Sequence, residues 1–166
     1  MDFIGEIHPP SSAQHKWILT ATYYFTKWIE TNPSRLATNA VIIKFLETNV
    51  LSRFGCPNKL IIDNVASFKS KKMIYFCSKY HITLGYSTSS YPHGNGLAES
   101  SNKSMVNVIK KLLEENKKSR HNKFINALWD DRLTSKKSIG MSPYQLVYEM
   151  DVVFPFSLGV PVMKII

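Results

Sequence analysis

The sequence is poor in cysteine and lacks a long hydrophobic run. Cys56 and Cys77 are the only cysteines among 166 residues and form no CxxC pair, so neither a disulfide framework nor a structural zinc site is expected. The longest apolar stretch, 152–163, contains Pro155 and Pro161 and is too short to span a bilayer. No segment at the start resembles a signal peptide. We therefore expect an intracellular protein without a membrane segment.

Acidic residues are also scarce. Lysine and arginine number 21 against 12 aspartates and glutamates, which gives a formal charge of +9 and a pI near 9.5. Such a balance is typical of proteins that bind a polyanion, although charge alone leaves open a protein that is merely basic and soluble. Nucleic acid is the partner that the composition favours.

The remaining composition predicts one globular domain over residues 1–166, without internal repeats or low-complexity segments. Apolar and β-branched runs predict strands at 3–7, 17–24, 59–62 and 81–86. Helical spacing predicts helices at 38–55, 67–80, 97–116 and 122–138, and the tail from Met141 contains SPYQLVY and then irregular Pro-rich sequence. Strands followed by helices that alternate with short strands indicate an α/β domain with a central mixed β-sheet flanked by α-helices.

Three carboxylates stand where a strand end or helix start meets a loop within apolar sequence: Asp2, Asp63 and Glu99. Carboxylate oxygens are hard ligands that suit Mg²⁺, which keeps waters and substrate phosphate oxygens in its remaining positions. Two such ions can activate an attacking hydroxyl and stabilise the leaving oxygen in phosphoryl transfer. The pattern therefore indicates metal-assisted chemistry on a phosphodiester.

Each carboxylate also has a simpler interpretation. Asp2 could be a frayed terminal residue, and Asp63 could cap a turn or helix after its strand. Glu99 could favour the positive end of its helix dipole without touching metal. Position alone does not decide between these readings.

Four ordered segments carry a family resemblance: MDFIG at 1–5, YFTKWIE at 24–30, LIIDNVASF at 60–68 and YPHGNGLAESSNK at 91–103. In addition, 35 residues separate Asp63 from Glu99, and SPYQLVY follows at 142–148. Together these features resemble the integrase catalytic core of gypsy-type long-terminal-repeat retrotransposons and of retroviruses. The resemblance covers nearly the whole chain.

This resemblance implies a ribonuclease-H-like fold in which Asp2 and Asp63 lie on neighbouring strands and Glu99 completes the metal site from a long helix. It implies Mg²⁺ or Mn²⁺ as cofactor, and DNA as substrate in 3′-end processing and strand transfer. A homodimer or higher oligomer is expected, with nuclear localisation when the protein engages DNA. The zinc-binding domain upstream and the further domain downstream in such integrases are expected to be absent from this chain.

Further residues are candidates for DNA contact. Asn102, Lys103 and Lys110 project from roughly the same side of the predicted helix as Glu99, where lysines could contact phosphates. The alternative is an ordinary solvated face with a Glu99–Lys103 pair one turn apart.

The loop preceding that helix also supplies candidates. His93 and Asn95 fall in the segment that resembles the flexible active-site loop of the family, where Gly94 would permit movement as DNA enters. An exposed connecting loop is the alternative interpretation.

The chain also departs from the family pattern. Tyr23 stands where the family usually has Asp, Ile62 replaces Ser or Thr, Val65 replaces Gly or Ala, His93 replaces Gln and Glu149 replaces Gly. These departures leave open a decayed or domesticated relic that only binds nucleic acid. A ribonuclease H or another nuclease of the same fold is a third possibility, which the YPHGNGLAES segment disfavours.

Overall fold

A three-stranded antiparallel sheet forms the centre of the computed structural model, which describes residues 1–8, 10–11, 13–62, 66–86 and 120–151. Its strands are β1 (Asp2–Ile4), β2 (Trp17–Thr22) and β3 (Ile29–Ser34), in that spatial order. The register sets Asp2 opposite Thr20 and Thr22 opposite Ile29. The β1–β2 hairpin confirms the predicted opening of the domain.

The strand boundaries differ from the sequence prediction. β1 ends at Ile4 rather than at residue 7, and β2 ends at Thr22 because Tyr23 begins the turn to β3. β3 itself was not predicted, since its sequence IETNPS is largely polar and contains Pro33. Proline is tolerated there because β3 is an edge strand of this sheet, where a backbone N–H can be dispensed with.

One continuous helical stretch follows, as predicted for 38–55. It comprises α1 (Asn39–Phe45), the π-helical turn η1 (Leu46–Leu51) and α2 (Ser52–Phe54). The Thr38 side chain accepts a hydrogen bond from the Val41 backbone at the start. Gly55 ends the stretch with a φ of +80°, a conformation that glycine adopts without steric cost.

A parallel strand pair comes next, formed by β4 (Lys59–Ile62) and β5 (Thr83–Tyr86). Between them lie η2 (Ala66–Lys69) and α3 (Lys71–Lys79). The bounds of β4 match the prediction, but the predicted helix start at Ser67 is too early, because the Ser70 hydroxyl accepts the hydrogen bond from Met73 that caps α3. β5 begins later than residue 81 because His81 and Ile82 still bond to the end of α3.

The C-terminal helices of the described chain are α5 (Arg120–Leu133) and α6 (Pro143–Tyr148). α5 ends before the predicted residue 138, and α6 forms in the SPYQLVY segment, for which no helix was predicted. Ser142 and Gln145 make a reciprocal capping box at its start. The predicted helix 97–116 lies outside the described residues. No helix in the described part is long and apolar enough to cross a membrane.

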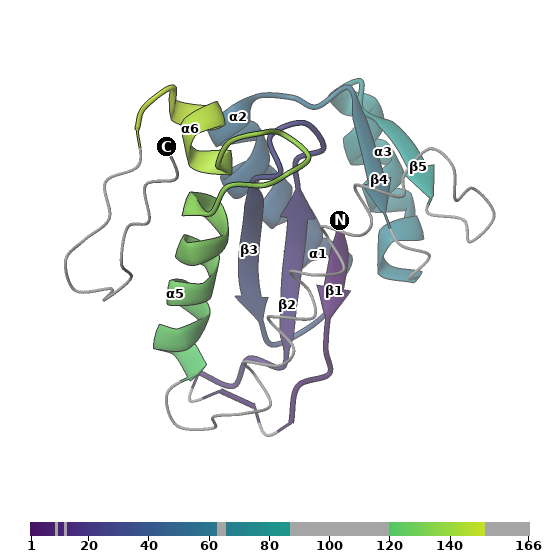
Figure 1. Cartoon of the computed structure of the whole chain (residues 1–166). Helices are drawn as coiled ribbons and strands as arrows, with labels where there is room; N and C mark the ends of the chain where they lie inside the picture. The colour runs from purple at the N-terminus through teal and green to yellow at the C-terminus, as the bar shows by residue number, and fades with distance from the viewer. Residues whose placement is uncertain (9, 12, 63–65, 87–119, 152–166) are drawn as a thin grey trace.

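Helices cover both faces of the antiparallel sheet (Figure 1). On one face, Leu19 and Ala21 pack with the buried side chains of α1, η1, β4 and α3. On the other, Ile4, Ile18 and Ile29 pack against Phe124 and Leu128 of α5. The result is a layered α/β fold, as expected. The described residues form separate three-stranded and two-stranded sheets rather than one mixed sheet. A hydrogen bond from the N-terminal nitrogen of Met1 to the Ile61 carbonyl links the two sheets.

Candidate catalytic edge and nucleic-acid interface

Asp2 lies at the start of β1, at the end of the sheet where β2 runs toward its turn. The Thr20 hydroxyl donates to the Asp2 carbonyl at 3.1 Å, so the backbone of Asp2 is held by its cross-strand neighbour. The residue is only partly buried. A carboxylate here is both fixed by the sheet and within reach of solvent, as a metal ligand requires.

The end of β4 meets the start of β1. The N-terminal nitrogen of Met1 donates to the Ile61 carbonyl at 2.7 Å, across a sequence separation of 60 positions. Ile62 is fully buried in the main core and is the last residue of β4. Asp63 is the next residue in the chain and lies outside the described residues. Two segments that each adjoin a candidate carboxylate therefore lie side by side.

Most of the predicted site falls outside the described residues. This holds for the predicted catalytic and metal-binding residues Asp63 and Glu99, and for the predicted DNA contacts His93, Asn95, Asn102, Lys103 and Lys110. Within the described ranges, no three His, Cys, Asp or Glu side chains come together as a metal site. The roles of these residues accordingly remain predictions.

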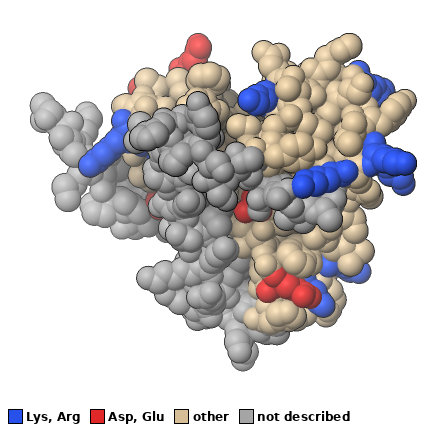
Figure 2. All heavy atoms as spheres, turned by 90° about the vertical axis from the view of Figure 1, so that its right-hand side faces the viewer, with Lys and Arg blue, Asp and Glu red and all other residues tan. Residues whose placement is uncertain are grey.

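Basic side chains dominate the lobe formed by β4, η2, α3 and β5. The described residues of this lobe, 59–62 and 66–86, carry five lysines and no aspartate or glutamate. Figure 2 shows blue side chains spread over the described part of this face, with few red ones. A surface of this sign attracts a polyanion and repels basic partners. The five residues are Lys59, Lys69, Lys71, Lys72 and Lys79.

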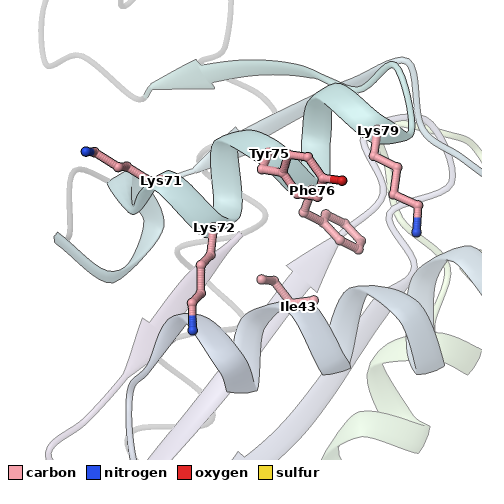
Figure 3. Close-up of a pocket in the computed structure, with 6 residues that line it drawn as sticks. All are labelled: Ile43, Lys71, Lys72, Tyr75, Phe76 and Lys79. Atoms are coloured by element: carbon pink, nitrogen blue, oxygen red, sulfur yellow. The ribbon is translucent and has the colours of Figure 1, made fainter.

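A groove of about 390 Å³ lies between α1 and α3 in this basic region. Figure 3 shows Ile43 of α1 facing the aromatic ring of Phe76, with Lys72 and Lys79 at either end. Lys71 and Tyr75 complete its lining. No carboxylate lines the groove, so it is not a place for carboxylate-bound metal, and the candidate catalytic edge lies elsewhere.

A buried polar cluster beside β3 was not predicted from the sequence. The Glu30 Oε1 atom accepts hydrogen bonds from Trp28 Nε1 at 2.7 Å and from Arg53 NH1 at 2.8 Å. Arg132 of α5 lies 3.6 Å from the same oxygen and donates twice to the Ile29 carbonyl. Its guanidinium also stacks over the Trp28 ring. The cluster joins β3, α2 and α5 and is structural, because Glu30 is only 3% exposed.

The described turn between β2 and β3 carries two exposed aromatic rings that the sequence analysis did not single out. Tyr24 is 54% exposed and Phe25 is 81% exposed. The preceding residue, Tyr23, turns inward, and burial raises the pKa of its phenol above the ordinary value. The sequence signal that could have identified these exposed rings is the pair of adjacent aromatic residues after the end of β2.

The sequence of this chain is similar to parts of known viral polyproteins. No family model matches the chain. The Gag-Pol polyprotein of avian reticuloendotheliosis virus is 27% identical over 134 residues, which is 81% of this chain and 12% of the polyprotein. The Pro-Pol polyprotein of feline foamy virus is 27% identical over 161 residues, 95% of this chain and 13% of the polyprotein.

This chain is similar to retroviral Pol polyproteins. Its fold matches a chain of the simian T-cell lymphotropic virus intasome, solved in complex with the PP2A regulatory subunit B56 gamma, with a TM-score of 0.65 at 18% identity. The match covers 99% of this chain and 58% of the intasome chain. The ribonuclease-H-like α/β fold and the resemblance to an integrase core are thereby confirmed. The chain spans only about an eighth of the polyproteins it matches.

Proposed function

We propose that this chain is the catalytic core of a retroelement integrase, which processes DNA 3′ ends and transfers the strands to target DNA. The observation that carries the proposal is the hydrogen bond from the N-terminal nitrogen of Met1 to the Ile61 carbonyl. This bond holds the start of β1, which bears Asp2, beside the end of β4, which precedes Asp63. The relationship to retroviral Pol polyproteins supports the same reading. The protein would act in the nucleus when engaged with DNA.

In this proposal Asp2, Asp63 and Glu99 hold Mg²⁺ or Mn²⁺. The chemistry of the donors fits, because all three offer hard carboxylate oxygens and Asp2 lies partly exposed on a fixed strand. The bound metal would activate the attacking oxygen and stabilise the leaving one.

Substrate DNA would be held by other residues of the chain. Asn102, Lys103 and Lys110 would contact DNA near Glu99, and His93 and Asn95 would contact it from the loop. The net charge of +9 favours binding to the phosphate backbone, which weakens as salt rises. A dimer or higher oligomer would engage two DNA ends.

The test is a strand-transfer and disintegration assay on labelled DNA with Mg²⁺ or Mn²⁺. Asp63→Asn and Glu99→Gln should abolish products while leaving the fold intact by circular dichroism. Glu47→Gln is the matched control, because Glu47 is an exposed carboxylate on η1 with no ion pair among the described residues. Products that persist in Asp63→Asn, or an equal loss in Glu47→Gln, would contradict the assignment of the carboxylates.

A DNA-binding relic is the second candidate, and one observation favours it. Tyr23, which stands where the family usually has Asp, buries its hydroxyl without a hydrogen-bond partner among the described residues. An unsatisfied buried hydroxyl costs about 1–3 kcal/mol, as expected of a copy no longer under selection for function. Calorimetric titration separates the candidates: a folded chain that binds DNA but neither Mg²⁺ nor Mn²⁺ would be a relic.

A further inference from the structure

The turn between β2 and β3 presents its aromatic rings from a fixed base. The Tyr23 backbone N–H donates to the Trp28 carbonyl, and the Lys27 backbone N–H donates to the Tyr23 carbonyl, both at 2.9 Å. The Trp28 N–H also donates to the Thr26 hydroxyl. Because the turn is pinned at both ends, its exposed side chains lose little freedom when they bind a ligand.

The two rings form one unit with a cation beside it. Tyr24 and Phe25 lie edge to face, with ring centroids 5.2 Å apart and an interplanar angle of 89°. The Lys27 ammonium lies 4.6 Å from the centroid of the Tyr24 ring. Most of Lys27 is buried, so its stem holds the ammonium against the turn. An aromatic surface with an adjacent positive charge suits a base and its phosphate.

Position connects this turn with the candidate catalytic edge. Asp2 pairs with Thr20, and Tyr24 follows Thr20 by four residues, so the rings lie at most about 13 Å along the strand from the level of Asp2. In Figure 1 the turn stands at the same end of the sheet as the N-terminus and the start of β1. At one nucleotide per 3.4 Å of strand, that distance is about four stacked nucleotides.

We propose that Tyr24 and Phe25 form a stacking platform for the bases of an unpaired DNA strand near the catalytic edge. This inference rests on the proposed function and adds to it a contact with bases, beyond the contacts with phosphates. Keeping a Phe ring 81% exposed is unfavourable in water, and a nucleobase is a partner that covers it while leaving its phosphate near Lys27. Stacking tolerates any sequence, since every base has a π-face.

The experiment measures binding of the whole chain to fluorescent single-stranded DNA by anisotropy, without divalent metal. An abasic strand of equal length has the same phosphates but no bases. The wild-type chain should bind the strand with bases at least about tenfold more tightly than the abasic strand. Tyr24→Ala with Phe25→Ala should remove this preference and leave the abasic affinity unchanged.

Two further variants keep the test decisive. Tyr75→Ala removes a ring that is 73% exposed on α3, away from the turn, and should preserve the preference. Tyr24→Phe with Phe25→Tyr keeps both rings and should also preserve it, even if the double alanine variant proves to fold poorly. An equal affinity of the wild-type chain for both strands, or a preference retained by a folded double alanine variant, would overturn the proposal.

Two other results distinguish base stacking from self-association of the chain and from the proposed strand transfer. If the double alanine variant changes the sedimentation of the chain but not its preference for bases, the turn is a self-association surface and the proposal is wrong. The binding assay requires neither divalent metal nor turnover, so it does not depend on the proposed catalysis. A chain that prefers bases but performs no strand transfer would therefore refute the proposed function alone.

Discussion

Replacing Glu30 by Gln tests whether the buried cluster beside β3 depends on charge. Glutamine keeps the shape of the side chain and an oxygen that accepts from Trp28 and Arg53, but it removes the negative charge. The Trp28 bond is buried and the Arg53 side chain is 41% exposed, so water screens the second interaction. Arg132, whose side chain is 19% exposed, loses its nearby counter-charge.

The expected destabilisation follows from these contacts. A hydrogen bond to a charged group contributes about 1.5–3 kcal/mol and one to a neutral group about 1 kcal/mol. The contribution of the Arg53 bond is smaller than this because solvent screens the exposed Arg53 side chain. We expect Glu30→Gln to lower the free energy of unfolding by about 2 kcal/mol. For a chain of this size that corresponds to a fall in Tm of about 4–8 °C.

Urea denaturation followed by tryptophan fluorescence measures this change, since Trp28 is part of the cluster. Glu47→Gln removes an exposed carboxylate and should change stability by less than about 0.5 kcal/mol. If Glu30→Gln is as stable as this control, charge does not hold the cluster together. A double-mutant cycle with Arg132→Met then shows how much of the loss is shared between the two residues.

Two further substitutions test the fold. Tyr23→Phe removes a buried hydroxyl without a partner among the described residues and should raise stability by about 1 kcal/mol. Because burial raises the pKa of Tyr23, the wild-type chain should lose stability as pH rises above 10, where the phenol ionises only in the unfolded chain; urea midpoints at neutral and alkaline pH should show Tyr23→Phe lacking this part of the loss. Ser142→Ala removes the cap of α6 and should cost about 1 kcal/mol by thermal denaturation.

The sequence predicted correctly those helices and strands in which apolar residues repeat at regular helical or strand spacing. The apolar spacing from Val41 to Leu51 gave the helical stretch, and the run before Asp63 gave β4 with the observed bounds. Periodicity cannot reveal α6, which has only six residues and depends on the Ser142 and Gln145 cap. A short helix of this kind is stabilised by its cap and by packing rather than by an amphipathic pattern.

β3 shows why long-range contacts escape a single sequence. Ile29 and Glu30 are both buried, which breaks the alternation expected of a strand with one solvated face. Glu30 is buried because Arg53 neutralises it from 23 positions away, and α5 contributes Arg132 from much further along the chain. Nothing near Glu30 in the sequence indicates these partners.

The candidate site also depends on contacts between segments that lie far apart in the sequence. Sequence patterns locate Asp2 at a strand start and Asp63 after a strand, but they do not say which strands are neighbours. That information came from the resemblance to integrases, and the Met1–Ile61 bond now supports it between segments separated by 60 positions. Within the described residues this hydrogen bond connects β1 to β4, while β1 pairs with β2 along its whole length. Cofactor binding there would add stability to the native state, so Mg²⁺ or Mn²⁺ should raise the Tm of the chain, and Asp2→Asn should abolish that rise.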